Sequence, residues 1–305
     1  MSRRELPVSD RAAESAGPAD HGVGRIETTH GALTPELAGM LGCALGHDAA
    51  PMPPTHTGAP LPPLWHWAAF PAFVPLSGLG RDGHPKRGGF LPALDFERRM
   101  WAGGRLWFKG ALSVGERLHR RSEILSVDFK TGASGDMAFV KVLHDLRGEG
   151  GGAIREEQDI VYMPIPASFR APKPIPAPAA ALFDEVLEAS PVRLFRYSAA
   201  TWNGHRIHYD RAYASEVEKY PGLVVHGPMQ ATLLMEAAMR HSGRAPSHFS
   251  YRGVHPLFDG PLRLQATTVE GAPRALALCT VAGGAVAGGT DQDHQGMQAR
   301  FEWED

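Results

Sequence analysis

The chain has 305 residues and a formal net charge of −2, with no long block of lysine or arginine. Because nucleic-acid-binding proteins usually carry a basic stripe, this balance argues against a nucleic-acid partner. No apolar run reaches the roughly 20 residues that a membrane-spanning helix needs. The two cysteines, Cys43 and Cys279, are too few for a disulfide framework or a thiolate metal site. We therefore expect a cytoplasmic protein without a membrane segment.

The first half of the chain predicts one helix followed by strands. Residues 1–30 are small and polar, and we expect them to be flexible. The segment TPELAGMLGCALG (34–46) predicts a helix, because a threonine can cap its start, proline suits its first turn and glycine suits its end. Alternating runs then predict two or three strands over 104–132, and two more over 137–147 and 153–163.

The second half begins after a proline-dense stretch, PIPASFRAPKPIPAPAAA (164–181), which is typical of an extended linker. The segment VRLFRYSAATW (192–202) favours a strand by its aromatic and β-branched content. The segment GPMQATLLMEAAMRHSG (227–243) predicts a helix buried on nearly all sides. Four antiparallel strands are expected after it. Since both halves show parts of the same order, we expect a divergent internal duplication.

The segment TWNGHRIHYD (201–210) carries the strongest chemical signal, because two histidines and a carboxylate fall within six residues. Shortly after it, a predicted helix begins at His226-Gly227. The first turn of a helix presents backbone N–H groups without partners, and these can stabilise negative charge on a thioester oxygen. A histidine titrates near neutral pH and can move a proton to or from water. Together these features indicate hydration of an acyl thioester.

These two segments resemble the MaoC-like, type-2 enoyl-CoA hydratase family of hot-dog proteins, whose catalytic loop reads Asp-x-Asn-Pro-(Ile/Leu)-His-x-Asp. On that resemblance His208 takes the position of the catalytic histidine, and the Gly227 N–H that of the group binding the thioester carbonyl. Asn203 stands where the family has its aspartate, His205 where it has asparagine, and Arg206 where it has proline. We expect His208 to carry the proton transfer, Asn203 to position water, and His205 to be a second candidate base.

The segments NGHRIHYD, VVHGPMQATLL, DGHPKRGGFLP and RRMWAGGR are similar to a narrower branch, the mesaconyl-CoA and itaconyl-CoA hydratases with an N-terminal domain like a fatty-acid-synthase dehydratase. The resemblance implies an α+β double hot dog, with two antiparallel sheets each wrapped round a central helix. It implies a flexible segment over 1–30, an N-terminal hot dog lacking the catalytic loop over 31–165, a linker over 166–185, and a catalytic hot dog over 186–305.

Several further residues are candidates for substrate binding. HPKRGG (84–89) and ERRMWAGGR (97–105) concentrate positive charge that could hold CoA phosphates or a free substrate carboxylate, or form a solvated face. For Asp210 we favour a role in capping or fixing the loop over one in the chemistry. The spacing of His205, His208 and Asp210 also permits a metal site, but thioester hydration needs no metal, so we expect neither metal nor cofactor. The candidates for substrate binding are Asp210, Arg206, His226, Gln230, Arg98, Arg99 and Arg105.

The function that we expect is reversible hydration of an enoyl-CoA, with a methyl-branched C5 dicarboxylyl-CoA as substrate and citramalyl-CoA as product. Three alternatives stay open: a 3-hydroxyacyl-ACP or -CoA dehydratase of fatty-acid metabolism, a hot-dog thioesterase using a carboxylate such as Glu236, and a non-catalytic acyl-CoA binder. The sequence leaves open whether the chain is a monomer or a homodimer.

Overall fold

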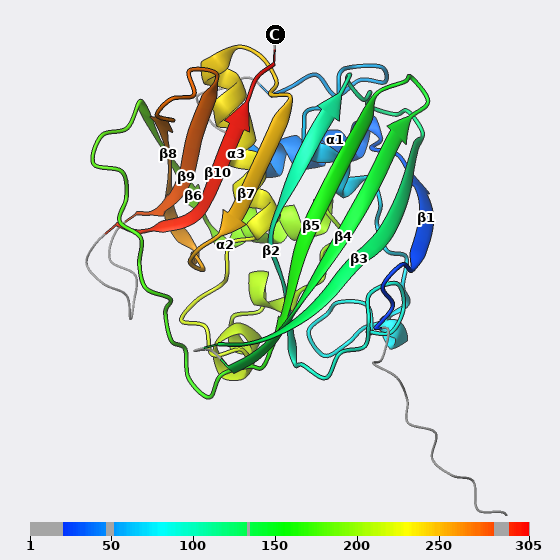
Figure 1. The fold of residues 1–305 in the computed structure, drawn as a ribbon, viewed down its shortest axis with the longest axis vertical. Coiled ribbons are helices and arrows are strands. Elements are labelled where there is room, and N and C mark those ends of the chain that lie inside the picture. Colours follow the sequence, from blue (N-terminus) through cyan, green and yellow to red (C-terminus); the bar gives the residue numbers. More distant parts are fainter. Residues whose placement is uncertain (1–20, 47–51, 133–134, 284–292, 305) are drawn as a thin grey trace, which may run out of the picture.

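The computed structural model describes residues 21–46, 52–132, 135–283 and 293–304. Their strands form one ten-stranded sheet in the order β1-β3-β4-β5-β2-β7-β10-β9-β8-β6. The helices lie together on one face of this sheet (Figure 1). In the described part of the chain, no helix is long and apolar enough to cross a membrane.

The sheet consists of two five-stranded halves with the same connectivity. The strands of the N-terminal half are β1 (Ile26–Gly31), β2 (Arg98–Lys109), β3 (Leu118–Gly132), β4 (Gly135–Gly148) and β5 (Ala153–Met163). Those of the C-terminal half are β6 (Phe183–Ala189), β7 (His248–Gly253), β8 (Gly260–Thr268), β9 (Ala275–Ala282) and β10 (Gln295–Glu302). In each half the first strand lies at an outer edge and the second at the centre of the sheet. This repeated order supports the expected internal duplication.

The two halves join where β2 pairs antiparallel with β7. Gly103 and Gly104, in the run WAGGR, lie where β2 pairs with β7. A side chain at Gly103 would place its Cβ 2.6 Å from the carbonyl oxygen of Tyr251, and one at Gly104 would place it 2.6 Å from that of Glu157. A β-bulge between Trp101 and Gly103 also shifts the register here. Glycine is therefore required where neighbouring strands approach β2.

Helices α1 (Pro35–Leu45) and α3 (Gly227–Ser242) occupy the segments where helices were expected. The Thr34 side chain accepts a hydrogen bond from the Leu37 N–H, and Pro35 opens α1, as predicted. Helix α3 is buried along nearly all its length against the main core and ends at Gly243, whose φ of +72° suits glycine. Because α3 packs on the sheet through its apolar side chains, its N-terminus is held in place.

The prediction of a strand over 192–202 was wrong, because residues 191–200 form helix α2 (Pro191–Ala200). The side chain of Ser190 accepts a hydrogen bond from the Arg193 N–H, and Pro191 occupies the first turn. Leu194, Tyr197 and Ser198 are buried at the spacing of one helix face. This cap, Ser-Pro, is the counterpart of Thr-Pro at the start of α1.

Two edge strands were also missed. Strand β1 lies in the segment that was expected to be flexible, although residues 1–20 of that segment lie outside the described residues. Strand β6 begins at Phe183, inside the stretch expected to be linker. Both lie at the outer edges of the sheet, where most side chains of β1 and about half of those of β6 are exposed.

Candidate active site

His208 lies in a short 3₁₀ turn, Arg206–His208, between α2 and α3, and is only 6% exposed. Its Nδ1 lies 2.7 Å from the carbonyl oxygen of Val224. Because a carbonyl only accepts, Nδ1 carries the proton and Nε2 keeps its lone pair. Burial, together with the neighbouring His226 and His205, holds the pKa of His208 well below its usual range. The ring is therefore a neutral base at neutral pH.

The ring of His208 stacks on that of His226, with centroids 3.6 Å apart and an angle of 20° between the planes. His226 immediately precedes Gly227, the first residue of α3. It is fully buried, its Nε2 is hydrogen-bonded to the Ser198 hydroxyl at 2.8 Å, and burial lowers its pKa to about 3. Its Nδ1 is buried without a partner among the described residues. The stack places the His208 imidazole against the ring of the residue that caps the start of α3.

His205 connects His208 to a buried ion pair. Its ring lies 5.3 Å from that of His208, and its Nε2 lies 3.7 Å from Oε1 of Glu218. Glu218 in turn accepts a 2.7 Å hydrogen bond from Nε of Arg98, while another guanidinium nitrogen of Arg98 donates to the Glu218 carbonyl oxygen. Both members of this pair are almost fully buried. Asn203 holds the loop, since its side-chain oxygen accepts from the His205 N–H at 3.0 Å.

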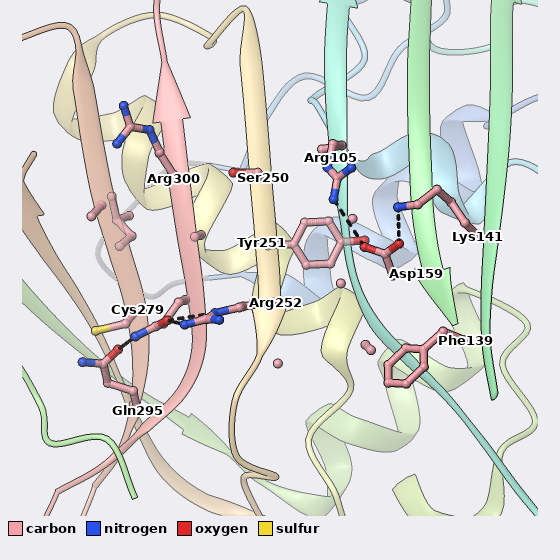
Figure 2. A pocket seen from close by; sticks show the side chains of 18 of the residues that line it. Arg105, Phe139, Lys141, Asp159, Ser250, Tyr251, Arg252, Cys279, Gln295 and Arg300 are labelled. Carbon is pink, nitrogen blue, oxygen red and sulfur yellow. Dashed lines mark hydrogen bonds and ion pairs between the residues drawn. The ribbon is translucent and has the colours of Figure 1, made fainter. Parts of the chain in front are cut away.

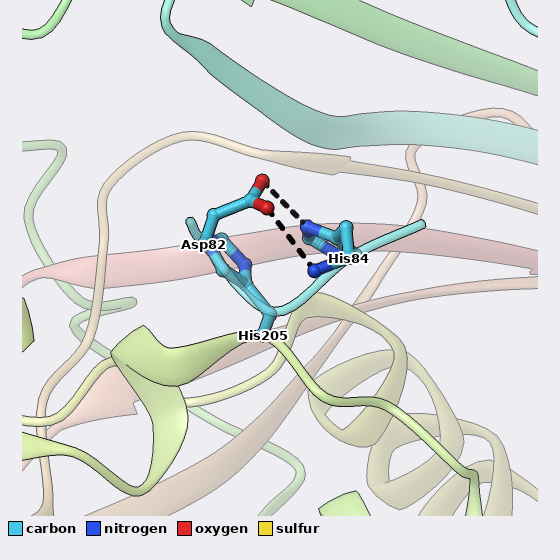
Figure 3. A group of neighbouring side chains, drawn as sticks. All are labelled: Asp82, His84 and His205. Atoms are coloured by element: carbon cyan, nitrogen blue, oxygen red, sulfur yellow. Dashed lines mark hydrogen bonds and ion pairs between the residues drawn. The ribbon is translucent and has the colours of Figure 1, made fainter. Parts of the chain in front are cut away.

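A loop of the N-terminal half reaches the same place. The Asp82 carboxylate accepts hydrogen bonds from the backbone N–H of His84 at 3.1 Å and from its Nδ1 at 3.0 Å, and His205 lies beside them (Figure 3). The rings of His84 and His205 are 4.2 Å apart. Burial lowers the pKa of His84 to about 4, although hydrogen bonding to Asp82 opposes the change. The site is thus built from both halves of the chain.

The contact between these loops is made by backbone. Asp82-Gly83-His84 and Asn203-Gly204-His205 have similar sequences, and the N–H of Arg206 donates to the carbonyl oxygen of Asp82 at 2.9 Å. Gly83 has a φ of +87° and lies directly against the Gly204 carbonyl. The two Gly-His loops therefore hold their imidazoles side by side.

Three of the residues expected to bind substrate have partners within the chain. Asp210 accepts a hydrogen bond from the Tyr213 N–H and forms an ion pair with Arg206, so it fixes the loop. The Arg206 guanidinium also lies over the Tyr213 ring. The amide of Gln230 donates to the Val225 carbonyl and accepts from the Thr280 hydroxyl.

The structure does not bring Arg105 together with the histidines. Leu106 faces the main core, so its neighbour Arg105 faces the opposite side of the sheet. There Arg105 pairs with Glu157 and Asp159. Figure 2 shows Arg105 beside Asp159 and Lys141 on the wall of a surface cavity. Arg98 belongs to the buried pair with Glu218, and Arg99 lines a separate cavity beside Asp82.

Where the structure describes them, His205, His208 and Asp210 do not form a group that could hold a metal ion, and Asp210 pairs with Arg206. Among the described residues, a different set converges: ligand atoms of Asp82, His84 and His205 all lie within 4.8 Å of one another. One of these contacts is the 3.0 Å hydrogen bond between Nδ1 of His84 and the Asp82 carboxylate.

Asp82, His84 and Glu218 were not identified as site residues from the sequence. A signal for the first two was present, because DGH repeats the pattern of NGH about 120 residues earlier. Glu218 had none, since its burial depends on Arg98, 120 residues away.

Comparison with known proteins places this site in a family. The model of the hydroxyacyl-thioester dehydratase type 2 family matches residues 64–259, which include both Gly-His loops and most of the described site. The chain belongs to this family. It is 47% identical over 208 residues to a mesaconyl-C(4)-CoA hydratase of Chloroflexus aurantiacus, covering 67% of this chain and 74% of the relative. It is 25% identical over 236 residues to the mitochondrial type 2 hydroxyacyl-thioester dehydratase of Schizosaccharomyces pombe, covering 66% and 76%.

Solved structures confirm the double hot dog fold. A MaoC-like dehydratase from Phytophthora capsici matches with a TM-score of 0.65 at 13% identity, covering 94% of this chain and 99% of that one. A Mycobacterium tuberculosis protein with a double hot dog fold matches with a TM-score of 0.55 at 15% identity, covering 92% and 95%. The expected α+β fold is therefore correct, and family membership makes the chain an acyl-thioester hydratase or dehydratase.

Proposed function

We propose that the chain reversibly hydrates an α,β-unsaturated acyl-CoA, with mesaconyl-C4-CoA as the preferred substrate and citramalyl-CoA as the product. The similarity to the Chloroflexus aurantiacus enzyme favours this substrate. The observation that carries the reaction type is the stacking of His208 on His226 at the start of α3. It brings a neutral base against the N-cap residue of α3, and the first turn of a helix presents backbone N–H donors.

The hydration follows from these two elements. The Gly227 N–H and the partial positive charge of the helix start polarise the thioester carbonyl. Nε2 of His208 takes a proton from water as the water oxygen bonds to the β-carbon, and the alkene electrons move onto the thioester oxygen as an enolate. The protonated imidazole then returns that proton to the α-carbon. The carbonyl re-forms, and the imidazole is neutral again.

Asn203 and His205 support this cycle without carrying the proton in it. The side-chain oxygen of Asn203 is bonded to the His205 N–H, which leaves the amide N–H groups to orient water. His205 lies between His208 and the Glu218 carboxylate. A negative charge near the imidazoles stabilises the cationic form of His208 that exists during turnover. Asn203 therefore positions water, and His205 together with Glu218 stabilises the cationic form of His208.

The thioesterase alternative receives no support from Glu236. This residue is nine positions beyond Gly227 on α3, about 13 Å along the axis. It accepts a hydrogen bond from the Trp65 indole, and burial raises its pKa. Release of free CoA from crotonyl-CoA would show thioesterase activity. The acyl-carrier-protein dehydratase alternative predicts a preference for long, uncharged acyl chains.

The test is hydration of mesaconyl-C4-CoA, itaconyl-CoA and crotonyl-CoA by the wild type and His208→Ala, followed by chromatography of the CoA esters. We expect the wild type to prefer mesaconyl-C4-CoA. Loss of the general base should lower kcat by about 10²- to 10⁴-fold. His119→Ala is the matched control, because its ring is 44% exposed and faces Glu149. Near-native turnover by folded His208→Ala would refute the assignment.

A further inference from the structure

Next to the paired Gly-His loops lies a cavity of about 390 Å³. It is formed between the loop over residues 80–87, which contains Asp82-Gly83-His84, and the start of β2. Asp82, which holds His84, lies on its wall, so the cavity adjoins the site described above. Its charged lining side chains are four cations and two anions: Arg81, Lys86, Arg87 and Arg99 against Asp82 and Glu97. This cavity therefore favours an anion.

Among the cations of this cavity, Arg99 stands out by its position. It is half-buried, and no aspartate or glutamate of the described chain forms an ion pair with it. Its neighbours are the hydroxyl of Tyr162, opposite it on β5, and the ring of His84. Arg98, the adjacent residue, is neutralised by Glu218, and the guanidinium of Arg87 donates to two backbone carbonyls. Partial burial of a cation without a counter-ion is unfavourable, so Arg99 is left to receive an anion from outside the protein.

The chemistry of the proposed substrate says where its free carboxylate must lie. In mesaconyl-C4-CoA this carboxylate is bonded to the β-carbon, the atom that receives water. It therefore lies within a few ångströms of the base. The ring of His205 lies 5.3 Å from that of His208 and 4.2 Å from that of His84, and Arg99 lines the same cavity as Asp82, the hydrogen-bond partner of His84. The guanidinium that can balance the free carboxylate of the substrate is therefore that of Arg99, on the side of the site where Asp82 lies.

Resting on the proposed function, we propose that Arg99 is the specificity residue for a 2-enoyl-CoA that carries a free carboxylate on its β-carbon. The guanidinium pairs with that carboxylate in the cavity beside Asp82, with two parallel N–H donors matching two carboxylate oxygens. Because the carboxylate is bonded to the reacting carbon, this pair lies beside His84 and His205, whose rings adjoin each other and the base. Substrates without the carboxylate leave the cation unpaired and are turned over less well.

A matched pair of substrates isolates this contact. In 3-methylcrotonyl-CoA a methyl group replaces the free carboxylate of mesaconyl-C4-CoA, and the CoA portion is identical. We would measure kcat/KM of the wild type and Arg99→Met on both esters, with Arg105→Met as a control on the same strand. The Arg99 variant should lose about 10- to 100-fold on mesaconyl-C4-CoA, the range for a hydrogen bond to a charged group, and change less than about threefold on 3-methylcrotonyl-CoA. The Arg105 variant should match the wild type on both.

The outcomes separate the inference from the proposed function. Equal losses on both esters would mean that Arg99 binds CoA or supports the fold, and unchanged rates on both would mean that it takes no part; either result overturns the inference while the hydratase assignment stands. Arg99→Lys should retain part of the selectivity if charge is what matters. Where wild-type activity on 3-methylcrotonyl-CoA is too low, crotonyl-CoA serves as the neutral ester. If the wild type hydrates none of these esters, the proposed function itself fails.

Discussion

Gly83 and Gly204 lie against each other so closely that a Cβ at Gly83 would stand 1.9 Å from the carbonyl oxygen of Gly204. Gly83 also has a φ of +87°, which L side chains rarely adopt. The two loops are therefore locked together by the absence of side chains. This contact positions His84 against His205, and with them the part of the site that comes from the N-terminal half.

Gly83→Ala tests this contact. We expect about 1–2 kcal/mol of destabilisation from the backbone conformation and about 1–3 kcal/mol more from the collision, measured by urea denaturation. Hydratase activity should fall because the His84 loop must move away. Gly271→Ala is the matched control, because it has a φ of +70° with nothing within 4 Å of the added Cβ. Equal effects of the two substitutions would mean that the contact does not matter.

Arg98 and Glu218 form a buried pair whose members depend on each other. Arg98→Met leaves the Glu218 carboxylate without its cation and should lower the free energy of unfolding by about 3–5 kcal/mol. The double variant Arg98→Met/Glu218→Leu removes both charges and should recover most of that loss. A double-mutant cycle measured by thermal or urea denaturation gives the coupling. If the losses of the two single variants add, the residues are independent and this description is wrong.

The buried His208 and His226 predict acid sensitivity. Burial lowers the pKa of His226 to about 3 and holds that of His208 well below the ordinary 6.5. The unfolded chain therefore binds protons that the folded chain does not. The stability contribution is present in full above pH 6.5 and is lost as pH falls from there toward the folded pKa values. Each fully buried ring contributes a slope of about 1.4 kcal/mol per pH unit in that window.

Urea denaturation between pH 7 and pH 4 measures this slope. His226→Phe keeps a ring against His208 but cannot titrate, so its slope should be smaller by the contribution of one histidine. A wild type whose stability does not change between pH 6.5 and pH 4 would contradict the lowered pKa values. The same argument applies to catalysis: kcat should not fall at pH 6.5, because His208 stays neutral well below it.

Metal removal provides a further test. Asp82, His84 and His205 are close enough to bind a cation, but Arg99 lies near the ring of His84 and disfavours added positive charge there. We expect dialysis against EDTA to leave hydratase activity unchanged, with less than one equivalent of metal in the purified protein by elemental analysis. One tightly held equivalent of zinc, with activity lost on its removal and restored on its return, would show that the histidines serve a metal.

The elements that were predicted correctly from the sequence are those whose own residues show an apolar pattern, a helix cap or a terminal glycine. Strands β2 to β5 and β7 to β10 have alternating or apolar runs, and α1 and α3 have caps or glycine stops within the segment. The edge strands β1 and β6 were missed because each pairs with one neighbour only and most of their side chains are not buried, so neither has a continuous apolar run. Helix α2 was read as a strand because Phe195 and Tyr197 outweighed the Ser-Pro cap.

The site residues also fall into two groups, those marked by a local sequence pattern and those brought together only by folding. His208, His226 and Gly227 could be placed because the loop and the helix start are close in sequence and match a known pattern. Asp82 and Glu218 act on His84 and His205 only after the halves have folded together. No local pattern distinguishes the three arginines of β2. Their positions along this bulged strand decide that Arg99 faces a cavity, that Arg98 pairs with the buried Glu218, and that Arg105 faces the other side of the sheet.

The pairing of β2 with β7 fuses two copies of one architecture into a single covalent unit. In a symmetric pair of identical subunits, a mutation in one loop appears in both, so chemistry and selectivity must share every residue. Here the copies vary independently. Asn203-Gly204-His205 can keep its place beside the base while Asp82-Gly83-His84 and its arginine neighbours change with the acyl group. Changes of substrate can therefore arise in the N-terminal half without altering the base.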